Sequence, residues 1–293
     1  MNLMFKNKKT IFICLLPALL IFVVLVIIPI VRSFYYGFFE WNGLSDPVYV
    51  GMNNFKEIML DKVFWKSFKN NMMVVVASVF GQIPIGLIIA ILLNKKMKSS
   101  SIFRTIFFLP MILSTVVVGL LWSTILNVQV GVLNYLLETI GLESLAKNWL
   151  GDPKYSMWTI CFVIVWQFVG LYMIIFLAAL QNIPQDIFEA ASIDGATEGQ
   201  KLFKITIPML WENIMSAVVL CIAGGMRTFD LVFVMTKGGP AHATELMATY
   251  MYNKTFEVYK YGYGSAVSLV IFIISFAFII ISRNAMAKKQ LEV

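Results

Sequence analysis

The chain has few charged residues and a single histidine. Of its 293 residues, 13% are charged and 59% are apolar, whereas a soluble domain has about 25% charged and about 45–50% apolar residues. The mean hydropathy is +0.81. A soluble protein of this composition would expose too much apolar surface, and a disordered one needs low hydrophobicity. The composition therefore excludes both classes and predicts a membrane protein.

Several kinds of functional site lack their usual residues. Because His242 is the single histidine, we expect no metal site and no Ser-His-Asp hydrolase. Cys14, Cys161 and Cys221 lie far apart in apolar runs, which is typical of small buried residues rather than of a disulfide framework. No Gly-Lys dipeptide occurs, so the chain has no phosphate-binding P-loop. If the protein uses ATP, another chain must hydrolyse it.

The net charge of +7 does not indicate nucleic-acid binding. Proteins that bind nucleic acid carry a basic stripe interleaved with aromatic residues, and none occurs here outside the apolar runs. We therefore expect no nucleic-acid partner and interpret the basic residues as signals of membrane topology.

Six apolar runs are long enough to cross a membrane, which takes about 20 residues in a helix. In lipid each backbone group must pair within its own segment, so these runs predict helices. The first run is too long for a signal peptide and lacks a cleavage site, so we expect it to be retained. The sequence predicts an all-α polytopic membrane protein with a single domain, 1–293. The six runs cover residues 11–31, 72–93, 105–126, 157–180, 214–235 and 264–281.

Basic residues are unevenly distributed between the two sides of these runs. Ten Lys and Arg occur in the 33 residues of segments 1–10, 94–104 and 282–293. The opposite side also has ten, but spread over the 98 residues of loops 32–71, 127–156 and 236–263. The positive-inside rule then predicts that both termini and loop 181–213 are cytoplasmic.

Loop 181–213 differs from the other cytoplasmic segments because it has five acidic residues and two lysines. Pro184 suits the first turn of a helix, and Ile187, Ala190 and Ala191 would form one apolar stripe on it. Gly195 follows as a turn, and a second short helix is expected at 197–204. An acidic helix would be repelled by an anionic membrane surface, which favours docking into a protein groove over lying on the bilayer.

This loop resembles the EAA motif of permease subunits in binding-protein-dependent ABC importers, EAA-x3-G-x9-I-x-L-P. Only the leucine differs, because Ile207 takes its place. The matching residues are Glu189, Ala190, Ala191, Gly195, Ile205 and Pro208. Four segments, 177–184, 229–230, 235–240 and 50–55, resemble the carbohydrate-uptake branch, the one that includes the first maltose-importer, glycerol-phosphate and oligosaccharide permeases. The resemblance covers nearly the whole chain.

The resemblance implies the type I ABC-importer permease fold with six spans, in a bacterial cytoplasmic membrane. It further implies a second, related permease as a heterodimer partner, a dimer of ATPase subunits that bind ATP and magnesium, and an extracytoplasmic sugar-binding protein. Each ATPase subunit would receive one EAA helix in a surface groove. The chain itself would then be a transport subunit and not an enzyme.

Ionisable residues inside a span are functional candidates. Arg227 and Asp230, three residues apart in the fifth run, can either form a structural ion pair or line a sugar path. In the family, sugar contacts come from the spans before and after the EAA loop. The candidate substrate-path residues are Gln167, Phe168, Leu171, Gly225, Arg227 and Thr228.

Two other functions are considered. An ion-coupled secondary sugar transporter would need unpaired carboxylates within its spans, and only Asp230 is available. An intramembrane enzyme would need a histidine cluster, an aspartate pair or a catalytic cysteine motif, which the sequence lacks.

Overall fold

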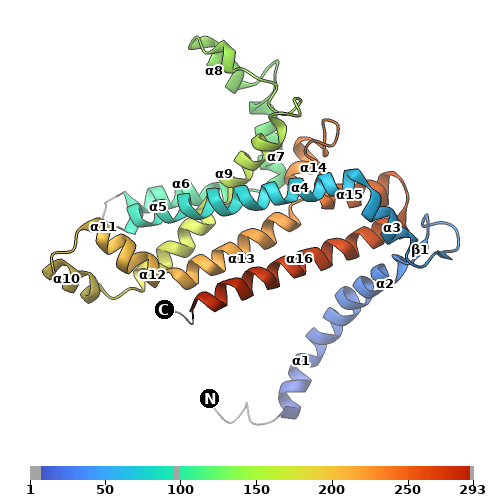
Figure 1. The fold of residues 1–293 in the computed structure, drawn as a ribbon, viewed down its shortest axis with the longest axis horizontal. Helices are drawn as coiled ribbons and strands as arrows, with labels where there is room; N and C mark the ends of the chain where they lie inside the picture. Colours follow the sequence, from blue (N-terminus) through green and yellow to red (C-terminus); the bar gives the residue numbers. More distant parts are fainter. Residues whose placement is uncertain (1–7, 95–98, 291–293) are drawn as a thin grey trace. The chain divides into compact units, whose positions relative to one another are not determined.

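A computed structural model describes residues 8–94 and 99–290, and almost every regular element in this part of the chain is a helix (Figure 1). The first elements are α1 (Lys8–Phe22), η2 (Val23–Ile27), α2 (Ile28–Tyr36), β1 (Phe39–Glu40), β2 (Val48–Tyr49), α3 (Asn53–Leu60), α4 (Lys62–Ala77), η3 (Ser78–Gln82), α5 (Ile83–Asn94), α6 (Ser100–Ile112), α7 (Thr115–Ile125), α8 (Val132–Thr139) and η4 (Glu143–Leu145). They are followed by α9 (Ser156–Gln181), α10 (Gln185–Ile193), α11 (Glu198–Lys201), η5 (Leu202–Thr206), α12 (Ile207–Met209), α13 (Trp211–Arg227), α14 (Asp230–Met235), α15 (Met247–Tyr252), η6 (Asn253–Glu257) and α16 (Tyr261–Gln290).

These elements form two compact units. The first comprises the described residues of Met1–Asp61 together with Met251–Phe272, and the second comprises those of Lys62–Tyr250 and Ile273–Val293. The helix α16 contributes residues to both.

The first unit contains the long apolar helix Ile11–Tyr36, which has no buried residue in its most apolar window. The two short strands that follow it pair antiparallel, with Phe39 opposite Tyr49. The side-chain amide of Asn54 donates to the carbonyls of Gly37 and Phe39, both at 2.9 Å. These hydrogen bonds hold α3 against the turn at the end of α2.

The second unit is built around α9, of which 61% of the most apolar window is buried. It has apolar residues on every side, as expected for a helix surrounded by others. One cluster packs α9 against α5 and α13 through buried residues such as Phe176, Met173 and Ala217. Lipid is as apolar as these side chains, so the hydrophobic effect does not drive such helices together in a membrane. Close van der Waals packing stabilises these contacts instead.

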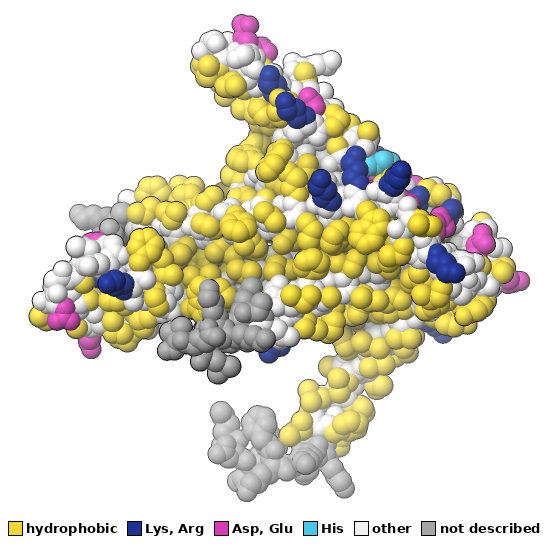
Figure 2. All heavy atoms as spheres, in the orientation of Figure 1, with side chains coloured by type: hydrophobic (Ala, Val, Ile, Leu, Met, Phe, Trp, Pro, Cys, Tyr) yellow, Lys and Arg dark blue, Asp and Glu magenta, His cyan; other side chains and the backbone are white. Residues whose placement is uncertain are grey.

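The structure supports the expected spans, with two of them bent. Four helices are long and apolar enough to cross a membrane by themselves: Ile11–Tyr36, Lys62–Asn94, Ser156–Gln181 and Tyr261–Asn284. Two bent helix pairs bring the number to six if each pair is one span: Ser100–Ile112 with Thr115–Ile125, bent by 97°, and Glu198–Met209 with Trp211–Arg227, bent by 64°. The first helix of the second pair belongs to loop 181–213. On the face drawn in Figure 2, hydrophobic side chains cover the middle of the second unit, and charged side chains lie toward its ends, some of them over α10 and α11.

The expectation of a continuous helix over 214–235 is wrong. The helix α13 ends at Arg227, and α14 begins only at Asp230. Between them Thr228 is extended, with φ −59° and ψ 126°, and Phe229 has φ −140° and ψ −62°. Span five is therefore broken near its end, at the residues that the sequence marks as candidates for a substrate path.

Candidate functional site: a coupling loop and a cavity beside span five

The loop 181–213 folds as two short helical segments around a glycine turn. After Pro184 the chain forms α10, and Gly195 then adopts φ +76°, a conformation that residues with a Cβ rarely take. Thr197 begins α11 with a capping box, since its hydroxyl accepts from the Gln200 N–H at 3.3 Å while its own N–H donates to Gln200 Oε1 at 2.8 Å. The helix–turn–helix expected from the sequence is confirmed, although the second segment continues through η5 and α12.

The motif residues of this loop are largely accessible. Glu189, Ala190, Gly195 and Pro208 are exposed, whereas Ala191 and Ile205 are half-buried. The expected apolar stripe is divided, because Ile187 packs with Phe188 against the cluster around α9. Ile187 therefore attaches α10 to its own chain. An apolar surface remains elsewhere, as Ile193 is 86% exposed and Phe203 is 69% exposed.

A cavity of about 340 Å³ lies between α9, α13 and the π-helical segment η3. Five of the six predicted substrate-path residues line it: Phe168, Leu171, Gly225, Arg227 and Thr228. The cavity is also lined by Phe229, the last residue of the break, and by Asp230, the first residue of α14. Five residues that the family resemblance implied for a substrate path therefore share one cavity wall.

Gln167 does not line the cavity. Its side chain is buried at 1% exposure, and its Nε2 donates to Thr115 Oγ1 at 3.3 Å, while Oε1 has no partner among the described residues. Gln167 precedes Phe168 on α9, and consecutive residues of a helix point about 100° apart. Phe168 therefore lines the cavity while Gln167 points away from it.

Sequence reasoning missed the contribution of η3. Gln82 lines the cavity together with Ser78. Its Nε2 donates to the Ile164 carbonyl at 3.2 Å, and its Oε1 lies 3.6 Å from Cys221 Sγ, so its amide contacts both α9 and α13. Single-turn π segments are frequent at functional sites. Gln82 is an amide side chain within the apolar run 72–93, and this could have marked it in the sequence as a candidate residue.

Arg227 and Asp230 do not form the ion pair that was one expectation. Within the described ranges 8–94 and 99–290, no ion pair joins them. The break at Thr228–Phe229 lies between the two residues, so the i, i+3 geometry of a continuous helix is lost. Both side chains are exposed on the cavity wall.

Comparison with known proteins identifies the family. The pattern of the family described as "Binding-protein-dependent transport system inner membrane component" matches residues 82–289. The chain belongs to this family. The permease is similar to the "Probable ABC transporter permease protein YurN" of Bacillus subtilis, with 38% identity over 93% of this chain and 94% of that protein. It is 34% identical to the "Multiple sugar-binding transport system permease protein MsmF" of Streptococcus mutans, over 89% of each.

The fold also matches a solved structure. A chain of a bacterial alginate ABC transporter, crystallised with an alginate pentasaccharide-bound periplasmic protein, aligns with a TM-score of 0.84 over 97% of the permease and 96% of that chain, at 22% identity. These findings confirm the expected permease fold and a transport subunit rather than an enzyme. They give no support to the ion-coupled alternative.

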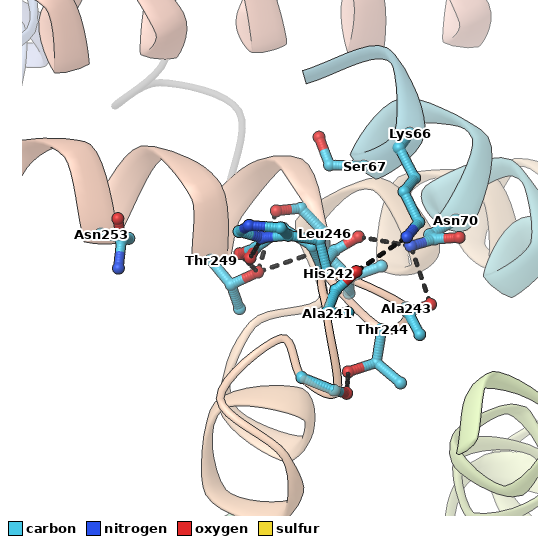
Figure 3. A network of polar contacts seen from close by, with 12 residues as sticks. Lys66, Ser67, Asn70, Ala241, His242, Ala243, Thr244, Leu246, Thr249 and Asn253 are labelled. Carbon is cyan, nitrogen blue, oxygen red and sulfur yellow. Dashed lines mark hydrogen bonds and ion pairs between the residues drawn. The ribbon is translucent and has the colours of Figure 1, made fainter. Parts of the chain in front are cut away.

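A second polar region of the permease lies beyond α14, in loop 236–246 (Figure 3). Glu245 is buried, and its carboxylate accepts from Thr249 Oγ1 at 2.7 Å and lies 2.8 Å from His242 Nδ1. From α4, Lys66 Nζ donates to the Ala241 carbonyl at 2.9 Å. Asn70 Nδ2 donates to the carbonyls of Ala243 and Glu245, at 3.1 and 2.8 Å. The loop is therefore held in one conformation by its own side chains and by α4.

Proposed function

We propose that the permease forms half of the translocation path of an ATP-driven importer for a sugar or oligosaccharide. The observation that carries the proposal is the cavity, which is lined by the polar residues Gln82, Thr228 and Arg227 together with the aromatic residues Phe168 and Tyr172. A sugar is bound by a few placed hydrogen-bonding groups and by aromatic surfaces. The name of the relative MsmF, a multiple sugar-binding transport system permease, supports the same substrate class.

The roles of the cavity residues follow from their chemistry. Arg227 and Thr228 would hydrogen-bond sugar hydroxyls, and Gln82 would do so from the opposite helix. Phe168, Leu171 and Gly225 would shape an apolar surface against which the sugar ring lies. At about 340 Å³ the cavity is near the lower end of the range for ligand sites, roughly 300–1,000 Å³, which suits a wall completed by a second permease.

The coupling loop would connect the permease to the subunits that use ATP. Glu189, Ala190, Ala191, Gly195, Ile205 and Pro208 are the residues that would enter a groove of the ATPase. The exposed side chains of Ile193 and Phe203 add apolar area to that contact. ATP and magnesium would be bound by the ATPase dimer, and a second, homologous permease would complete the heterodimer.

The topology and the remaining partner belong to the same proposal. Chain 1–293 would act as one transmembrane domain of a bacterial cytoplasmic membrane, with both termini and loop 181–213 in the cytoplasm. Loop 236–246 would then face outward, where an extracytoplasmic sugar-binding protein delivers substrate. A single cysteine at exposed Lys56 should react with an impermeant thiol reagent in intact cells, whereas one at exposed Lys204 should not.

Uptake in proteoliposomes tests the proposal. The permease is purified with its native partner subunits, and the sugar released from the copurified binding protein is identified by mass spectrometry. We expect uptake of that sugar to require ATP inside and the binding protein outside. Uptake that survives removal of ATP but stops when the proton or sodium gradient collapses would instead establish the ion-coupled function.

A further inference from the structure

The break in span five leaves a backbone carbonyl that another helix satisfies. In a continuous helix the carbonyl of Gly225 would accept from the N–H of residue 229, but α13 ends at Arg227. Instead, Asn71 of α4 donates its Nδ2 to this carbonyl at 2.9 Å. Gly225 permits the approach, because a Cβ there would lie 2.7 Å from Val75 Cγ2 and 3.2 Å from its Cα.

The other end of the same amide reaches the residue that follows loop 236–246. Asn71 Oδ1 accepts from the N–H of Met247, the first residue of α15, at 2.8 Å. Only the nitrogen of an amide can donate to a carbonyl and only its oxygen can accept from an N–H, so these two partners fix the orientation of the side chain. Asn71 is fully buried, so water does not replace either hydrogen bond.

The neighbouring residue Asn70 makes a different set of contacts. Its amide donates to two carbonyls of loop 236–246 and to none of span five. Asn70 therefore anchors the loop, whereas Asn71 touches both the loop's end and the break. Two adjacent asparagines of one helix thus offer a matched pair for separating the two effects.

We propose that Asn71 is a positioning residue that joins loop 236–246 to the break in span five, so that a partner displacing the loop also displaces the cavity wall at Gly225. This rests on the proposed function in one respect, namely that the partner is the sugar-binding protein. The linkage passes through Met247, Asn71 and Gly225, and the wall that moves includes Thr228 and Phe229. Asn71 itself need not touch the sugar.

Matched substitutions separate the two asparagines. Asn71→Asp keeps an oxygen for the Met247 N–H but replaces the donor to Gly225 with a second acceptor. In the complete transporter we expect the maximal rate of ATP hydrolysis stimulated by the sugar-loaded binding protein to fall roughly tenfold, the effect of one buried hydrogen bond. The binding-protein concentration that gives half of that rate should change less than about threefold. Asn70→Asp should do the reverse, raising this concentration while largely keeping the maximal rate.

The result that overturns the proposal is equally specific. If Asn71→Asp and Asn70→Asp alter the same parameter to the same extent, Asn71 only helps to hold the loop. Asn71→Leu, which removes both hydrogen bonds without introducing a charge, replaces Asn71→Asp if the latter does not assemble with its partners.

A distance measurement tests the linkage with Asn71 unchanged and without the sugar. Spin labels at exposed Ser216 of α13 and exposed Lys237 of loop 236–246 report the distance across the break. We expect the same distance in the nucleotide-free complex and in the complex trapped with ATP and vanadate. A change of more than about 5 Å, nearly the rise of one helical turn, would show that the loop and α13 move independently and would overturn the proposal. If no sugar-binding protein stimulates the wild-type complex, the proposed function fails, while this distance still tests the linkage.

Discussion

The two loops that flank span five are built in opposite ways. The coupling loop before it leaves most of its motif residues exposed, and among the described residues no atom beyond the chain neighbours of Gly195 lies within 4 Å of where its Cβ would be. Loop 236–246 after it has buried Glu245 and Thr244 and is held to α4 by Lys66 and Asn70. A loop with unused apolar and charged surface is suited to binding another protein, whereas a loop whose polar groups are already paired is suited to keeping its shape.

The cavity lies along the span between these loops. Its wall includes the break after α13, which Asn71 stabilises from α4. The two loops are therefore joined to the cavity in different ways. The coupling loop continues directly into α13, whereas loop 236–246 is joined to the cavity wall by the hydrogen bonds of Asn71. The experiments below test this difference, from the largest expected effect to the smallest.

The strongest test changes the exposed loop. Gly195→Trp forces a bulky residue into a left-handed conformation, which costs roughly 1–2 kcal/mol, and places a ring on the surface proposed to dock. Glu189→Lys reverses an exposed charge on the same element. We expect both variants to insert in the membrane at the wild-type level, to lose copurifying ATPase and to abolish uptake. Normal uptake in both would contradict the coupling role.

A second test compares two glutamines of the membrane region. Gln82→Leu removes a polar group from the cavity wall, and we expect uptake to fall about tenfold, as for the loss of one or two hydrogen bonds to substrate. Gln167→Leu removes a side chain outside the cavity whose Oε1 has no partner in the described part of the chain, so uptake should stay within about twofold of wild type. Initial uptake rates in proteoliposomes measure both. An effect of Gln167→Leu equal to that of Gln82→Leu would mean that lining the cavity does not account for the loss, and would contradict a role of Gln82 in binding sugar.

These glutamines also show which features of the fold and of the cavity the sequence could predict. Length and hydropathy predicted the spans because lipid forces the backbone to pair internally, and Pro184 with Gly195 predicted the helix–turn–helix of the coupling loop. The break at Thr228–Phe229 was not predictable, since no Gly or Pro occupies those two positions and the Gly225 carbonyl is satisfied by Asn71, 154 residues earlier. The sequence likewise could not tell Gln167 from Phe168, because apolar residues surround α9 on all sides and leave no polar face to orient it.

A third test measures how strongly loop 236–246 holds its shape. Glu245→Ala would remove the buried carboxylate to which Thr249 Oγ1 donates, although the Leu246 carbonyl remains as the second acceptor of that hydroxyl. A hydrogen bond to a charged group is worth about 1.5–3 kcal/mol. His242→Ala removes a partner whose side chain is 55% exposed and should cost less than about 1 kcal/mol. Thermal unfolding of the purified complex should therefore show a clear drop in Tm for Glu245→Ala and little change for His242→Ala. Equal drops would mean that Glu245 stabilises the loop through its contact with His242 and not through Thr249.

The smallest effect comes from two glycines of the coupling loop that differ in backbone conformation. Gly195 has φ +76°, whereas Gly199 lies within α11 without a positive φ, and neither has an atom within 4 Å of a built Cβ. Alanine at 195 therefore costs about 1 kcal/mol of backbone strain, while alanine at 199 favours the helix by a similar amount. If docking requires the turn as it stands, Gly195→Ala should weaken retention of the ATPase about fivefold, and Gly199→Ala should leave it unchanged or slightly stronger. Titration of the purified ATPase against each variant in nanodiscs measures the difference. Equal affinities for the two variants would mean that the left-handed turn at Gly195 is not kept when the loop binds its partner.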